Sequence, residues 1–214
     1  MKHIKILILF FFTACNNTSL KPIANKPLNS KEITIPLKDT LGNIVLTIPT
    51  RYDTLLIWTH FTDYSGGHLE KYRLQPKKLP IYEESGWISG SLSDSVDQIT
   101  IEHYKHLRIP DTSDTFLRKA HTNSLTAAKL DATMYKVTFD TLQKINNKLF
   151  SIIASENYDT LKKVYSKQLR AATILKGNIL RLTYSLLTKV KDSITDNFIP
   201  NSEKLLQETL FNGL

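Results

Sequence analysis

Cys15 is the only cysteine in this chain of 214 residues, so no disulfide can form within the chain. A domain built from such a sequence must be stabilised by burying apolar side chains. The composition permits this, because 41% of the residues are hydrophobic, 22% are charged and only 7 are Gly. The length fits one ordinary globular domain.

The residues before Cys15 form a basic start followed by an apolar run. Lys2 and Lys5 precede the uninterrupted apolar residues 6–12, and the small residues Thr13 and Ala14 follow. This apolar stretch is far shorter than the roughly 20 residues that a membrane-spanning helix needs. The pattern predicts a secretory signal that takes no part in the fold.

Residues 12–15, with the sequence FTAC, resemble the lipobox of bacterial lipoproteins. The resemblance implies a signal peptide over residues 1–14 and a Cys15 that carries diacylglycerol and an amide-linked acyl chain such as palmitate. Phe12 departs from the leucine that is usual there. Two or three acyl chains would hold the protein firmly, since each buried methylene contributes about 0.8 kcal/mol. The alternative is a conventional signal peptide with an incidental cysteine.

The segment after Cys15 is polar. Residues 15–31 contain two prolines and no acidic residue, which predicts a flexible tether between the lipid and a domain over residues 32–214. Asn16 is not the aspartate that often retains lipoproteins at the inner membrane, and no acidic cluster follows. The resemblance therefore implies the periplasmic face of the outer membrane, with the cell surface as the alternative.

The charge of the chain is moderately positive. The formal charge is +8, and loss of Lys2 and Lys5 with the signal leaves +6. The cationic side chains are scattered among acidic ones without a long run of either sign, which is typical of a solvated surface. Such a surplus can also favour an anionic membrane or an acidic partner, whereas a nucleic-acid partner is not expected.

The first half of the body predicts strands. Alternating or β-branched apolar residues are bounded by turn residues, and the first two strands form a hairpin. The expected strands cover residues 32–37, 44–48, 54–61, 69–75, 87–91 and 98–104.

The second half predicts helices as well as strands. Apolar residues at helical spacing indicate a helix over residues 114–130, and the Asn146-Asn147 turn joins strands over 134–139 and 148–155. Residues 159–172 fit a helix or a strand, and we favour a strand from about Val164, within a long hairpin that reaches residue 187. A last helix is expected to begin at Asn201 or Ser202, bury Leu205, Leu206 and Leu210, and end at Gly213.

These elements predict an α+β fold: a mainly antiparallel sheet with a central helix and a C-terminal amphipathic helix packed on it. Their order loosely resembles that of the PsbP-like α/β/α family, which occurs in bacterial envelope lipoproteins and includes DcrB-type proteins. The resemblance rests on element order over residues 32–214 and implies no site residues.

The common nucleotide, hydrolase and metal motifs are missing, and no catalytic pair of acids stands out, so no catalytic residue, cofactor or metal is predicted. Glu102, His103 and His106 could ligate a metal if they were helical. In the predicted strand, residues three apart face opposite ways, so we interpret these as surface side chains.

The candidate binding surface is a cluster of aromatic and polar residues: Trp58, His60, Asp63, Tyr64 and His68. Aromatic rings with polar tips are common at interfaces. Packing at a strand end is the alternative explanation.

Two functions remain after these exclusions. The first is a monomeric, lipid-anchored envelope protein that binds another protein without catalysis, as an assembly factor or an immunity protein. The alternative is a carrier that holds a small apolar ligand or lipid in a pocket between sheet and helix. An enzyme would need a site that these motifs do not reveal.

We predict that Cys15→Ser releases the protein from membranes, because the serine hydroxyl cannot carry the thioether-linked lipid. Metabolic labelling with a palmitate analogue, followed by membrane fractionation, measures both the lipid and its effect. A wild-type protein that takes up no label and fractionates as soluble would contradict the lipoprotein assignment.

Overall fold

The computed structural model describes residues 29–61, 68–79, 95–104, 114–130 and 136–212. In these residues the strands form two antiparallel sheets, one of seven strands and one of three. The predicted antiparallel sheet is confirmed, although helices make up a smaller part of the molecule than the α+β prediction implies. The strand expected over residues 87–91 lies outside the described residues.

The seven-stranded sheet has the order β3-β4-β5-β9-β8-β7-β6, and the small sheet has the order β1-β2-β10. The large sheet consists of β3 (Thr54–His60), β4 (Leu69–Gln75), β5 (Val96–Tyr104), β6 (Lys136–Ile145), β7 (Lys148–Asp159), β8 (Val164–Leu175) and β9 (Asn178–Thr188). The small sheet consists of β1 (Ser30–Leu37), β2 (Gly42–Pro49) and β10 (Leu210–Asn212), and the helices are α1 (Asp114–Leu130), α2 (Ser193–Asp196) and α3 (Phe198–Gln207).

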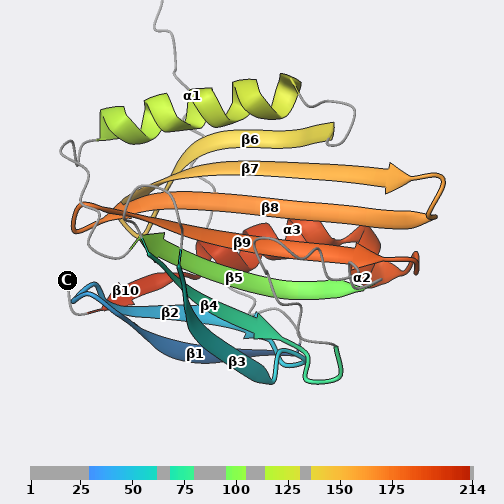
Figure 1. The fold of residues 1–214 in the computed structure, drawn as a ribbon, viewed down its shortest axis with the longest axis horizontal. Coiled ribbons are helices and arrows are strands. Elements are labelled where there is room, and N and C mark those ends of the chain that lie inside the picture. Colours follow the sequence, from blue (N-terminus) through green and yellow to red (C-terminus); the bar gives the residue numbers. More distant parts are fainter. Residues whose placement is uncertain (1–28, 62–67, 80–94, 105–113, 131–135, 213–214) are drawn as a thin grey trace, which may run out of the picture.

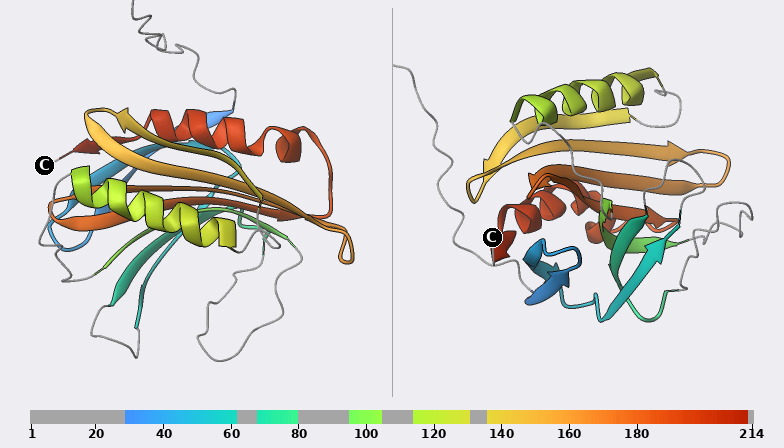
Figure 2. Two further views of the ribbon diagram at one scale, coloured as in Figure 1. Left: turned by 90° about the horizontal axis from the view of Figure 1, so that it is seen from above. Right: turned by 60° about the vertical axis from the view of Figure 1, so that its left-hand side comes forward.

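The large sheet is covered on both faces. Helix α1 lies across β6, β7 and β8 on one face, while α3 and the small sheet lie behind the other face (Figure 1). Figure 2 shows the large sheet between α1 and α3 when the molecule is viewed from above. The described part of the chain contains no helix that is long and apolar enough to cross a membrane.

Tight turns set the register of the long hairpins. Asn146 and Asn147 have φ values of 46° and 65°, and Lys176 and Gly177 have φ values of 48° and 81°. Two successive residues with positive φ match the right-handed twist of the strands that they join. The hairpins predicted around both turns are confirmed, and the strand from Val164 is confirmed for the ambiguous segment.

The predicted start and end of the last helix are wrong. Helix α3 begins after Asn197, so Asn201 and Ser202 lie inside it. Pro200 can occupy its first turn, because N–H groups in that turn have no partner within the helix. The helix ends at Gln207, and Leu210 lies instead on β10, where it is 42% exposed.

The apolar core lies between the large sheet and the layer formed by α3 and the small sheet. Its fully buried side chains come from both sheets and the helix, and include Ile44 of β2, Phe150 of β7, Leu182 of β9 and Leu206 of α3. Among the described residues, the buried members of this core lie between Ile35 and Leu206.

We predict that Leu206→Ala lowers the free energy of unfolding by about 2 to 5 kcal/mol, because it leaves a cavity at a fully buried position. Leu210→Ala is the matched control and should cost much less, since that side chain is already 42% exposed. Urea unfolding of both variants measures the difference. Equal losses would show that α3 does not close the core as described.

Candidate functional site

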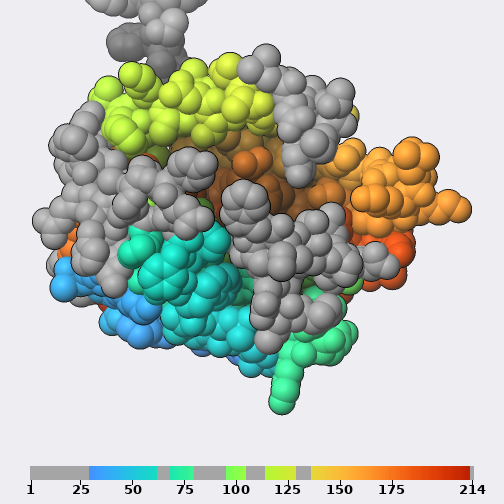
Figure 3. All heavy atoms as spheres, viewed as in Figure 1, coloured from blue at the N-terminus to red at the C-terminus, as the bar shows by residue number. Residues whose placement is uncertain are grey.

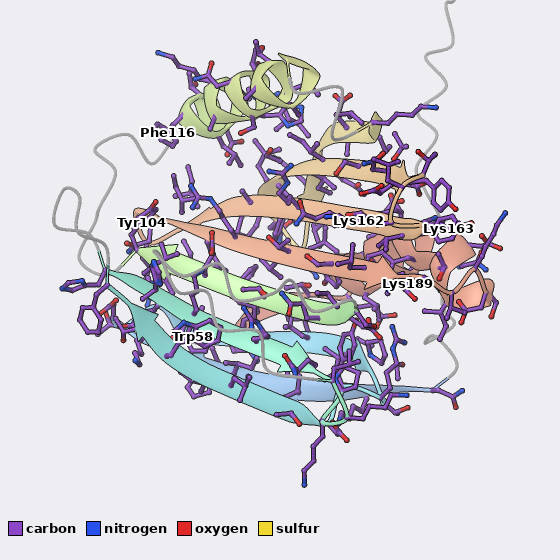
Figure 4. The ribbon with its side chains drawn as sticks, turned by 45° about the vertical axis from the view of Figure 1, so that its right-hand side comes forward. Trp58, Tyr104, Phe116, Lys162, Lys163 and Lys189 are labelled. Atoms are coloured by element: carbon purple, nitrogen blue, oxygen red, sulfur yellow. The ribbon has the colours of Figure 1, made fainter. Side chains whose placement is uncertain are left out.

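Three of the five candidate binding residues lie at one end of the β3–β4 pair. Trp58 and His60 share a face of β3, and His68 directly precedes β4. Trp58 (labelled in Figure 4) has its ring 4.9 Å from the guanidinium carbon of Arg73. The ring of His68 meets the Phe61 ring edge-on, with centroids 4.6 Å apart. Asp63 and Tyr64 lie outside the described residues.

The strand that carries Trp58 and His60 is an edge of the large sheet. Among the described residues β3 pairs with β4 alone. Two apolar side chains on or next to it are well exposed, Ile57 at 48% and Phe61 at 69%. Figure 3 shows side chains of β3 at the surface on the face in view, whereas every residue of β4 is buried.

The other long edge strands differ from β3 in sequence. β6 carries three charged residues and lies beside α1 (Figure 1), and β1 carries Lys31, Glu32 and Pro36. Charged residues, proline and covering helices are the usual protections against pairing with a further strand. β3 has the sequence TLLIWTH, which contains no Lys, Arg, Asp, Glu or Pro. In the described part of the chain no second strand pairs with β3, so the large sheet ends there.

A buried polar cluster joins the two sheets below this edge. Glu70 of β4 is fully buried, accepts a hydrogen bond from Lys38 Nζ at 2.6 Å and accepts another from Thr59 Oγ1 at 2.9 Å. The main-chain N–H of Lys38 also donates to the Tyr72 hydroxyl at 2.8 Å. Burial of a charge is costly unless it is paired, so these contacts fix the end of β1 against β3 and β4.

His103 lies next to this cluster and is 1% exposed, so its interpretation as a surface side chain is wrong. It is on the face of β5 that carries the core residues Ile99 and Ile101. Its Nδ1 lies 3.8 Å from Asp39 Oδ2. Burial lowers the pKa of His103, against the opposing effects of the Tyr104 carbonyl and the Asp39 carboxylate. Among the described residues no group of three His, Cys, Asp or Glu side chains could hold a metal, and His106 lies outside them.

Ser151, His121 and Asp140 form an arrangement that the sequence did not suggest. His121 Nδ1 lies 2.9 Å from Ser151 Oγ, and His121 Nε2 lies 3.6 Å from Asp140 Oδ1. These are the groups of a hydrolytic triad, but Ser151 and His121 are each 7% exposed, between α1 and the sheet. A nucleophile there cannot reach a substrate while α1 is in place. We assign these contacts to helix packing.

A pocket of about 810 Å3 lies between α2, α3 and the connection from β2 to β3. Buried Tyr184, Phe198 and Leu205 line it together with polar residues that include Arg51 and Lys204. Arg51 is held in place by Asp97, with Nε 2.7 Å from Oδ2. The volume is of the size that small-molecule sites have.

Comparison with known proteins provides no family for this chain. No protein-family model and no curated protein matches it. A solved structure of PA94 from Pseudomonas aeruginosa, a protein of unknown function, covers 83% of this chain and 94% of its own, with 9% identity and a TM-score of 0.38. A similarity at this level is too weak to assign a fold or a function to this chain.

We predict that the wild-type protein loses stability as the pH falls below about 6.5, in part through His103. The unfolded His103 takes up a proton near its ordinary pKa of 6.5, whereas the folded one does so only at a lower pH. Between these two pKa values the unfolded state binds more protons than the folded state, so the free energy of unfolding decreases as the pH is lowered. Urea unfolding of wild type and His103→Gln between about pH 8 and pH 5 should show a weaker pH dependence in the variant. Parallel curves would contradict this assignment.

Proposed function

We propose that this protein is a lipid-anchored component of the bacterial cell envelope that binds another protein without catalysis, as an assembly factor or an immunity protein. The basic and apolar start, the FTAC sequence and the polar tether support an anchor at Cys15. On the same basis we propose the periplasmic face of the outer membrane, with the cell surface as the alternative. The helices on both faces of the large sheet support a PsbP-like relationship, which stays part of the proposal.

The open edge at β3 is the observation that carries the protein-binding proposal. An edge strand presents unpaired main-chain N–H and C=O groups, which an extended segment of another protein can pair with. Such pairing gives affinity through main-chain hydrogen bonds and specificity through alternate side chains. Ile57 and Trp58 lie on opposite faces of β3, so each would contact a different face of an added strand.

The exposed apolar residues fit the same partner. Ile57 and Phe61 lose contact with water when an apolar strand covers them, and each Å2 of apolar surface that is removed from water contributes about 25 cal/mol. The partner is therefore a protein that offers an extended segment with apolar side chains.

The pocket beside α3 favours a second candidate function, the binding of a small ligand. Its volume of about 810 Å3 and its position beside α3 support this candidate, because small-molecule sites are concave and of similar size. Its lining includes Asn29, Asn197 and Asn201 as well as Arg51 and Lys204, so it suits an amphipathic ligand with an anionic end better than a purely apolar one.

We predict that a photo-crosslinking residue in place of Phe61 forms a discrete adduct with one envelope protein in the native host. Ile57→Lys in the same chain should abolish that adduct, because a lysine on an edge strand opposes pairing with a further strand. Immunoblotting of the membrane fraction measures the adduct, and thermal unfolding checks that the variant is folded.

The matched control places the crosslinker at Leu210, which is 42% exposed on β10, and there the same adduct should be absent. An adduct of twice the mass of this chain would contradict the proposal, since it would show self-association through β3. An adduct that persists in the Ile57→Lys variant would contradict it as well. A small-ligand carrier would form no discrete adduct at either position.

A further inference from the structure

Two connections lie at the end of the large sheet where β9 ends. The hairpin between β7 and β8 turns through residues 160–163, since Asp159 pairs with Val164. The chain leaves β9 just after Thr188, which pairs with Tyr165 on the neighbouring strand. Figure 3 shows this end of β7 and β8 standing out beyond the rest of the molecule.

This end carries an unusual share of the exposed apolar side chains. Leu161 at the hairpin turn is 94% exposed, Val190 is 58% exposed and Tyr158 is 44% exposed. Of the seven large apolar side chains most exposed in the described residues, these three and Ile194 lie here. Single exposed apolar residues are ordinary, but a concentration on one projection indicates a contact surface.

Exposed lysines surround these apolar side chains. Lys162, Lys163 and Lys191 are all exposed, and Figure 4 shows Lys162, Lys163 and Lys189 at the same end of the sheet. We call Leu161, Lys162, Lys163, Val190 and Lys191 the lysine tip.

The acidic side chains next to the lysine tip are engaged in local structure. Asp159 Oδ1 accepts hydrogen bonds from the main-chain N–H groups of Leu161 and Lys162, both at 2.9 Å. Asp192 caps α2 by accepting from the N–H of Thr195 at 2.9 Å. Glu156, further along β7, pairs with Lys167 at 3.2 Å. These carboxylates keep their negative charges. Residues 156–167 and 188–196 together contain five lysines and four acidic residues, so this end of the sheet carries a small positive surplus.

We propose that the lysine tip binds the surface of a lipid bilayer that contains anionic headgroups. Leu161 and Val190 enter the boundary between headgroups and acyl chains, and the lysines contact lipid phosphates, with their methylene stems along the apolar layer. A projecting pair of turns has too little area for an ordinary protein interface, which buries about 800 Å2 on each partner. Lysine is also depleted in the core of protein interfaces, whereas each lysine close to an anionic membrane strengthens binding to that membrane.

The start of β1 lies near the same end of the molecule. Asn29 and Ser30 line the pocket together with Ser193 and Ile194, which come shortly after Lys191 in the chain. A lipid on Cys15 would be joined to Asn29 by a segment that spans at most about 50 Å. If Cys15 carries the proposed lipid, the anchor and the lysine tip can therefore reach the same membrane. The affinity of the tip for lipid does not depend on that anchor.

The test uses residues 16–214, which include every residue that the structure describes and lack Cys15, so that no acyl chain contributes. In a flotation assay the protein should bind vesicles of equal parts phosphatidylglycerol and phosphatidylcholine. High salt should weaken this binding, and vesicles of pure phosphatidylcholine should not bind the protein. Lys162→Gln/Lys163→Gln should lower the partition coefficient about thirtyfold, since two lysines at about 1 kcal/mol each convert to that factor. Leu161→Ser should lower it by about tenfold.

The matched control is Arg118→Gln/Lys119→Gln, which removes the same charge from exposed positions on α1 and should bind as wild type does. Equal binding of both double variants, or no binding to anionic vesicles, would overturn the proposal. The Ile57→Lys variant should keep its affinity for vesicles, so failure of the strand-addition proposal and failure of this one give different results.

Discussion

The structure depends on covering one apolar face of the seven-stranded sheet. The side chains of β5, β7, β8 and β9 on that face are almost completely buried, and they are buried by α3 and the small sheet. Without a disulfide, this contact is the main source of stability. It also explains why the small sheet joins both ends of the described chain, since β2 pairs with β1 and with β10.

This arrangement of the core leaves β3, among the described residues, with a paired strand on one side only. The small sheet covers the face of the large sheet but does not extend it, so β3 remains an edge. The ion pair between half-exposed Lys38 and buried Glu70 joins the two sheets beside that edge. Glu70 is fully buried, so its carboxylate would be costly without the hydrogen bonds from Lys38 and Thr59. These contacts fix the end of β1 against β3 and β4.

Much of the strand pattern could be predicted because local signals specify it. Alternating apolar residues and the turns at Asn146-Asn147 and Lys176-Gly177 define the hairpins from neighbouring residues alone. The start of α3 was predicted at Asn201 or Ser202 because both are favourable N-cap residues, but the helix begins after Asn197 and accommodates Pro200 in its first turn. The burial of His103 was missed because it depends on the small sheet, whose Asp39 reaches it from far along the sequence.

The candidate site was found only in part from the sequence. Trp58, His60 and His68 are brought together by β3 and β4, because residues near in sequence meet across a hairpin. That β3 lies at an edge could not be predicted, since strand order depends on which distant strands pair. The contact between His121 of α1 and Ser151 of β7 could not be predicted either, because it depends on how the helix packs on the sheet.

Hydrogen–deuterium exchange of the isolated protein tests the open edge most directly. In an edge strand, about every second amide points away from the neighbouring strand and has no ladder hydrogen bond. Alternate amides of β3 should therefore exchange rapidly, while those of β9, which pairs with β5 and β8, should exchange slowly along its length. Uniformly slow exchange along β3, equal to that of β9, would show that the edge is already paired and would contradict the proposed mode of binding.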